Sequence, residues 1–144
     1  MGATIVKQAT HEFRVRTRGP GAHEFTRDVV DWVAETGIAE GLLTLHGRHT
    51  SASLLIMENA DPTVLDDLER WMRRAVPPGD AIFRHTAEGP DDMPAHVRTA
   101  LTPISLSIPV IDGRPALGTW QGLFVYEHRD DPHQRRVAAH LLGE

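Results

Sequence analysis

Hydrophobic and polar residues along this chain follow two spacings, and the shorter one predicts strands. Apolar and polar residues alternate over 13–17, as they do in a strand with one buried face. Mostly apolar runs at 42–46 and 53–57 predict two more strands on either side of a polar loop, and residues 81–83 predict a short fourth strand. We therefore expect three strands in the first half of the chain and a short fourth early in the second half.

A hairpin is predicted in the second half. Residues 105–111 and 116–126 are strand-like, and the pair Asp112-Gly113 between them favours the positive φ angles of a type I′ turn. The tail at 136–142 is apolar without a clear period, so its pattern alone leaves strand and helix open.

The longer spacing is that of helices. Thr26 is expected to cap a first helix that ends at Gly37, where glycine adopts the left-handed conformation typical of this position. Asp61 and Pro62 predict the start of a second helix, because aspartate accepts hydrogen bonds from free amides and proline fits the first turn. The expected buried face of the second helix comprises Val64, Leu65, Leu68, Trp71 and Met72.

A third, shorter helix is predicted near 94–101, with Asp91 or Asp92 as its cap. Many strands with two or three interspersed helices predict an α+β fold. The 144 residues contain no internal repeat and no linker long enough to separate domains, so we expect a single domain over residues 1–144.

Composition narrows the classes of function. The formal net charge of −5 argues against general binding to nucleic acid, which usually needs a basic surface. No apolar run approaches the roughly 20 residues that span a membrane, and the N-terminus lacks the apolar core of a signal peptide. We therefore expect a cytoplasmic protein with a small-molecule ligand. The chain has no cysteine but nine histidines, which become the natural candidates for metal ligands.

Three histidines stand at ends of predicted elements. His49 and His85 lie at strand ends, and His96 lies early in the third helix. Three neutral imidazoles suit a transition metal such as zinc, but their spacing matches no compact metal-binding motif. The residues alone leave two alternatives open, which are one shared metal or separate surface and capping histidines. His128 is among the remaining histidines that we expect at the surface.

The segment LGTWQG at 117–122 carries two glycines, a hydroxyl, an indole and an amide within a predicted strand. Small polar groups beside a flat ring are typical of a strand that faces a ligand, and the alternative is a bulged core strand with Trp120 buried. Glu127, near the end of the same strand, is either a buried acid or a general base.

Four motifs resemble those of one protein family. They are HTSA at 49–52 with ENADP at 58–62, DDMPAH at 91–96, and the IP, DG and LGTWQG pieces within 108–122. Their order resembles that of the YjbQ-like family, a family of uncharacterised proteins. The resemblance covers nearly the whole chain, from the first strand to the tail.

The resemblance implies a fold, an assembly and an activity. The fold is a two-sheet β-sandwich with two or three helices in which the tail is a strand, and the assembly is a homotrimer. Family members are associated with a weak, secondary thiamine-phosphate synthase activity, which joins hydroxymethylpyrimidine diphosphate to thiazole phosphate and releases pyrophosphate. Two departures are Pro103, where relatives often have glycine, and HRDDP at 128–132, where relatives usually have an aromatic-acidic turn.

Carried over to this chain, the motifs imply a divalent metal ion, zinc or magnesium, held by His49, His85 and His96, with the LGTWQG segment as one wall of that site. Catalytic roles fall to His49, Glu58, Gln121 and Glu127. Substrate contacts fall to Thr50, Asp92, Thr119 and Trp120. The chain lacks a glycine-rich phosphate loop, so the alternative is a non-catalytic trimer that binds a metabolite or a metal.

Overall fold

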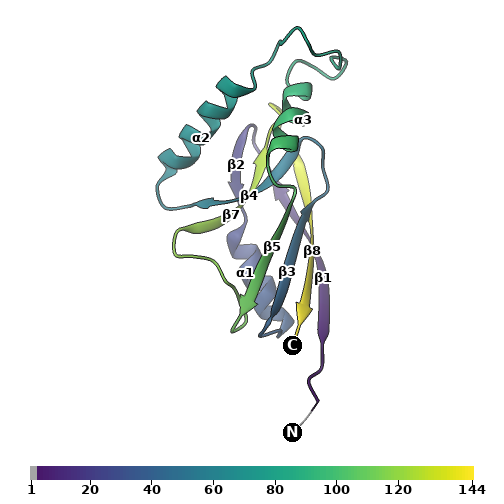
Figure 1. The fold of residues 1–144 in the computed structure, drawn as a ribbon, viewed down its shortest axis with the longest axis vertical. Helices are drawn as coiled ribbons and strands as arrows, with labels where there is room; N and C mark the ends of the chain where they lie inside the picture. Colours follow the sequence, from purple (N-terminus) through teal and green to yellow (C-terminus); the bar gives the residue numbers. More distant parts are fainter. Residues whose placement is uncertain (1–2) are drawn as a thin grey trace.

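The computed structural model describes residues 3–144, which form three helices and two antiparallel sheets (Figure 1). The helices are α1 (Thr26–Thr36), α2 (Pro62–Ala75) and α3 (Asp92–Leu101). The strands are β1 (Lys7–Arg16), β2 (Gly21–Glu24), β3 (Gly41–Gly47), β4 (Ala52–Glu58), β5 (Ser105–Ile111), β6 (Arg114–Pro115), β7 (Gln121–Glu127) and β8 (Gln134–Gly143). One sheet has the order β1-β8-β3-β5-β6 and the other β2-β7-β4, which confirms the α+β class and the strand at the tail.

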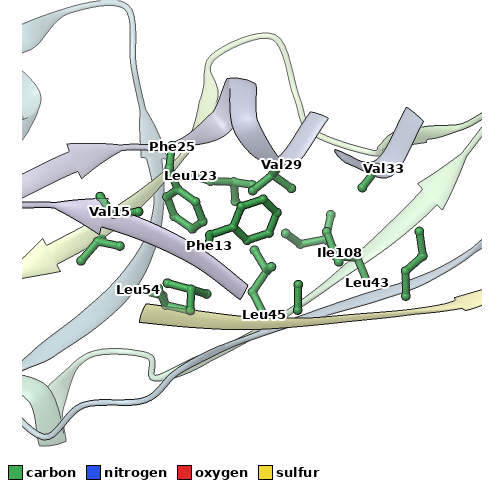
Figure 2. Packing of buried hydrophobic residues seen from close by; sticks show 14 of the residues in the cluster. Phe13, Val15, Phe25, Val29, Val33, Leu43, Leu45, Leu54, Ile108 and Leu123 are labelled. Carbon is green, nitrogen blue, oxygen red and sulfur yellow. The ribbon is translucent and has the colours of Figure 1, made fainter. Parts of the chain in front are cut away.

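The main hydrophobic core lies between the five-stranded sheet, α1 and one face of the three-stranded sheet (Figure 2). Phe13 from β1, Val29 from α1 and Leu123 from β7 meet there, and each is almost fully buried. A second cluster on the other face of the three-stranded sheet joins Phe124 of β7 to Met72 of α2. The three-stranded sheet therefore lies between the main core and α2.

Local signals placed several boundaries correctly. The Asp61 side chain accepts a hydrogen bond from the backbone N–H of Thr63 at 2.9 Å, at the start of α2. Gly37 ends α1 with a φ of 71°. Asp112 and Gly113 both have positive φ angles, 52° and 74°, in the hairpin turn between β5 and β6.

Other predictions on the elements were wrong. Residues 81–83 lie in a turn, where the Asp80 side chain accepts a hydrogen bond from the backbone N–H of Ile82 at 3.0 Å. The predicted strand at 116–126 begins only at Gln121, and it is not the hairpin partner of β5, because β7 pairs with β2 and β4 in the other sheet. Thr26 lies inside α1, where its hydroxyl donates to Glu24 at 2.7 Å. Trp71 is 54% exposed, because α2 packs on a narrow sheet that covers only part of its apolar face.

None of the helices described over residues 3–144 is long and apolar enough to cross a membrane. This finding agrees with the absence of a long apolar run in the sequence.

His128, directly after β7, is 2% exposed, so its expected place at the surface was wrong. Its Nε2 lies 2.9 Å from Ser53 Oγ, and its ring packs against that of Tyr126 with 4.4 Å between the centroids. Burial, followed by the positive charge of Arg98, lowers the pKa of His128 to about 3. The imidazole is therefore neutral in the folded protein at pH 7.

We expect the folded protein to lose stability as the pH falls from 6.5 towards 3, because the unfolded chain binds a proton at His128 in this range and the folded chain does not. Between pH 6.5 and about pH 5 this group should lower the free energy of unfolding by roughly 1.5 kcal/mol. Urea denaturation measures this loss, and the His128→Phe variant should show a correspondingly weaker dependence on pH. The same pH dependence in both proteins would contradict the assignment.

Candidate functional site

Two histidines and a carboxylate gather at the start of α3. Asp92 and His96 lie one helical turn apart on α3, and His85 comes from the loop before it. One ligand atom from each of the three residues lies within 4.8 Å of the others. Asp92 Oδ2 is 2.7 Å from His85 Nε2 and 3.2 Å from His96 Nε2. The structure thus brings His85 and His96 together, as expected, and adds Asp92.

Arg129, in the loop between β7 and β8, orients the carboxylate of this cluster. Its Nη1 donates to Asp92 Oδ1 and its Nε donates to Asp91 Oδ2, both at 2.9 Å. Asp92 is 2% exposed. Burial disfavours its charged form, but the hydrogen bond to His85 and the charges of His96 and Arg129 outweigh burial and lower the pKa of Asp92. Asp92 is therefore an ionised carboxylate. Asp91 occupies the N-cap position of α3, as predicted, but its side chain makes no capping hydrogen bond.

His96 faces the carboxylate through a nitrogen that carries no proton in the neutral ring. Its Nδ1 lies 2.9 Å from the backbone carbonyl oxygen of Thr50, which can only accept a hydrogen bond. Nδ1 therefore holds the proton, and Nε2 points its lone pair at Asp92 Oδ2, 3.2 Å away. A second proton on His96 turns this contact into an ion pair, and a metal ion between the two atoms would satisfy it equally. The three side chains are therefore a group that could hold a cation.

His49 lies outside this ligand group. Its Nε2 accepts a hydrogen bond from the backbone N–H of Arg136 at 2.7 Å, and its Nδ1 is 3.5 Å from Arg135 Nη1. Burial, followed by the charges of Arg135 and Arg136, lowers the pKa of His49. Among residues 3–144 the three histidines expected to share a metal do not form such a group, and Asp92 stands in the place of His49.

Glu127 is fully buried at the end of β7, where hydrogen bonds occupy both carboxylate oxygens. Its Oε2 accepts from Thr17 Oγ1 and from Arg135 Nε, both at 2.7 Å. Its Oε1 accepts from the backbone N–H groups of His128 and Arg129, at 3.1 and 3.0 Å. Burial disfavours the charged form, but the hydrogen bonds from Arg135 and Thr17 outweigh it and lower the pKa of Glu127. This geometry matches the buried-acid alternative rather than a general base that faces a substrate.

The LGTWQG segment lies at the far end of β7. Gln121 pairs with Glu58 at one end of the β7–β4 ladder, and Glu127 lies at the other end. Six residues of extended strand separate the two ends by roughly 20 Å. Trp120 is largely exposed rather than buried. Within one chain, four residues expected in the site therefore lie away from the His85–Asp92–His96 cluster, namely Glu58, Thr119, Trp120 and Gln121.

Sequence reasoning missed the two arginines that organise this region. Arg129 holds Asp91 and Asp92, and Arg135 pairs with Glu127. Both follow β7, in or just after the segment HRDDP whose role the sequence left open. The sequence signal that could have identified Arg129 and Arg135 is their position shortly after Glu127, the acidic residue that ends an apolar strand, in a chain with a net negative charge.

Sequence comparison relates the chain to known proteins over almost its whole length. Residues 11–144 match the family described as UPF0047 protein YjbQ-like. A UPF0047 protein of Synechocystis is 50% identical over 142 residues, which are 99% of this chain and 97% of that protein. The UPF0047 protein YjbQ of Escherichia coli O157:H7 is 43% identical over 125 residues, which are 86% of this chain and 90% of that protein.

Solved structures share the fold. A crystal structure from Sulfolobus solfataricus P2, described as a YbjQ-like protein of unknown function, has a TM-score of 0.88 at 21% identity and covers 97% of this chain and 100% of its own. A hypothetical protein from Aeropyrum pernix K1 has a TM-score of 0.85 at 32% identity and covers 94% of this chain and 99% of its own. Together with the motifs and the sequence matches, this likeness shows that the chain belongs to the YjbQ-like UPF0047 family.

Proposed function

We propose that His85, Asp92 and His96 hold a divalent metal ion and that the protein uses it for secondary thiamine-phosphate synthesis. The observation that carries the metal is the convergence of one ligand atom from each of the three side chains within 4.8 Å of the others. A metal ion about 2.0–2.2 Å from each ligand atom would bind all three in place of the contacts between them. Two imidazoles and one carboxylate suit zinc better than magnesium, which prefers oxygen ligands.

The proposed reaction joins the two substrates while the bond to the leaving diphosphate breaks. A divalent metal supplies charge that stabilises this leaving group. The chain's own residues position the ligands, since Arg129 holds Asp92 and the carbonyl of Thr50 sets the ring of His96. Glu127 supports the site indirectly, because it accepts a hydrogen bond from the backbone N–H of Arg129, whose side chain holds Asp92. The reaction itself rests on the resemblance to the family.

Removal of the metal by a chelator should abolish thiamine-phosphate formation, and added zinc should restore it. The His96→Gln variant should bind zinc at least about tenfold more weakly, because it loses a ligand. Equilibrium dialysis with metal analysis measures the affinity, and an assay with the pyrimidine diphosphate and the thiazole phosphate measures turnover. His11→Gln is the matched control, because His11 is exposed on β1 and is not a member of the cluster.

The outcomes separate the two functions. Zinc bound tightly by the wild type but with no turnover would favour the alternative, a non-catalytic trimer that binds a metal or a metabolite. Equal zinc affinity in His96→Gln, His11→Gln and the wild type would overturn the metal site itself.

We also propose that the chain forms a homotrimer through the outer face of the five-stranded sheet. Leu42 of β3 and Leu142 of β8 are direct partners in the register and are 48% and 46% exposed. The next row places His140 between Thr10 and Thr44, so largely small and uncharged side chains surround the two leucines. Association of identical chains buries such a face, and the family resemblance favours three copies.

Light scattering coupled to size-exclusion chromatography should give a mass about three times the 16.0 kDa of one chain. Leu42→Glu should shift this mass towards the monomer, because it places a charge in the proposed interface. Ile82→Glu is the control, since Ile82 is also exposed but lies in the loop after α2. A monomeric wild type would refute the trimer.

A further inference from the structure

His49 in the loop between β3 and β4 and Arg135 in β8 place two hydrogen-bond donors beside each other. Because His49 Nε2 accepts the backbone N–H of Arg136 at 2.7 Å, this nitrogen carries no proton. The ring proton of His49 is therefore on Nδ1, which lies 3.5 Å from Arg135 Nη1. Arginine nitrogens only donate, so this contact is not a hydrogen bond. An oxygen atom placed within reach of both groups would satisfy both.

These donors line a surface cavity of about 430 Å³. Its polar wall consists of His46, Arg48, His49, Thr50, Ser51 and Arg135, and no carboxylate belongs to the wall. Four other surface cavities of the described chain each include at least one aspartate or glutamate. In a chain with a net charge of −5, a cavity that carries two guanidinium groups and no acid selects for anions.

The buried guanidinium of this cavity is held in place before any ligand arrives. Arg135 is 5% exposed, and its Nε donates to Glu127 while its Nη2 donates to Ser51 Oγ at 3.0 Å. Glu127 offsets its charge but does not line the cavity. Arg48 brings a second, half-exposed guanidinium, which pairs with Glu12 at 3.2 Å. A donor fixed as Arg135 is binds an anion without the cost of ordering its side chain.

We propose that this cavity is an oxyanion site that takes a phosphate group. The phosphate oxygens would accept from His49 Nδ1, from Arg135 Nη1 and from the hydroxyl of Ser51, whose own proton is free to donate. The site needs no metal ion and does not rest on the proposed activity. It adjoins the metal cluster through Thr50, which lines the cavity and accepts from His96 through its carbonyl. A substrate that carries phosphate would fit both positions.

The test is isothermal titration of the full, metal-free chain with inorganic phosphate and, in a second arm, with glycerol 3-phosphate. We expect Arg48→Gln to weaken phosphate binding about fivefold or more, because it removes a positive charge from the cavity wall, and His49→Phe about tenfold, because it removes the Nδ1 donor. Arg14→Gln should leave binding unchanged. Arg14 is the matched control, since it is also exposed, also pairs with Glu12 at 3.2 Å and does not line the cavity.

Tighter binding of glycerol 3-phosphate than of phosphate would support the site and assign it to phosphate esters, and the reverse order would assign it to free phosphate. Equal weakening by Arg48→Gln and Arg14→Gln would overturn the proposal, because it would show only general charge attraction. The proposal would also be overturned if the wild type did not bind phosphate at millimolar concentration. If His49→Phe does not fold, the comparison of Arg48→Gln with Arg14→Gln still tests the proposed phosphate site. The His96→Gln variant should keep its phosphate affinity, which separates this site from the metal site.

Discussion

The buried carboxylate of Glu127 is the interaction on which the functional end of the molecule depends. It collects donors from the segment after β1, from the turn after β7 and from the start of β8, through Thr17, two backbone N–H groups and Arg135. A buried ion pair that loses one partner leaves an uncompensated charge, which costs about 3–5 kcal/mol. The charge of Glu127 therefore holds three segments in one arrangement.

Both candidate sites lie next to this carboxylate. On one side, the backbone of Arg129 is bound to Glu127 while its side chain holds Asp91 and Asp92 at the start of α3. On the other side, Arg135 presents its remaining nitrogen to the cavity beside the β3–β4 loop. The two sites have opposite character, because one offers an ionised carboxylate with two imidazoles and the other offers donors without any acid. The two proposed sites together would suit a phosphate-bearing substrate bound with a metal ion.

The arrangement of the sheets has a different consequence. The three-stranded sheet is covered on both faces, by the main core and by α2, whereas apolar side chains on the outer face of the five-stranded sheet remain exposed. Leu42 and Leu142 lie on that face, and Trp120 is exposed at the end of β7 that lies away from the histidines. Within one chain, Leu117 of the LGTWQG segment packs against the main core, whereas Gly118, Thr119, Trp120 and Gln121 are exposed. The proposed trimer would bury part of the outer face of the five-stranded sheet.

Short-range chemistry was enough to determine the boundaries of several elements and part of the site. Asp61, Gly37 and the pair Asp112-Gly113 act on their own neighbours, so their turns and caps follow from sequence. The proximity of Asp92 and His96 follows from helical spacing alone.

Only the tertiary structure determined which residues from distant parts of the sequence contact Asp92, His96 and the other site residues. Arg129 reaches Asp92 across 37 positions and Arg135 lies against His49 across 86, because the pairing of β7 and β8 with other strands brings them there. His128 is buried by the same packing, although its polar neighbours in the sequence predict a surface position. The extended length of β7 keeps Gln121 far from Glu127, although motif order suggested one site. Spacing along the chain specifies neighbours within a turn or a helix, whereas strand pairing over long separations specifies the rest.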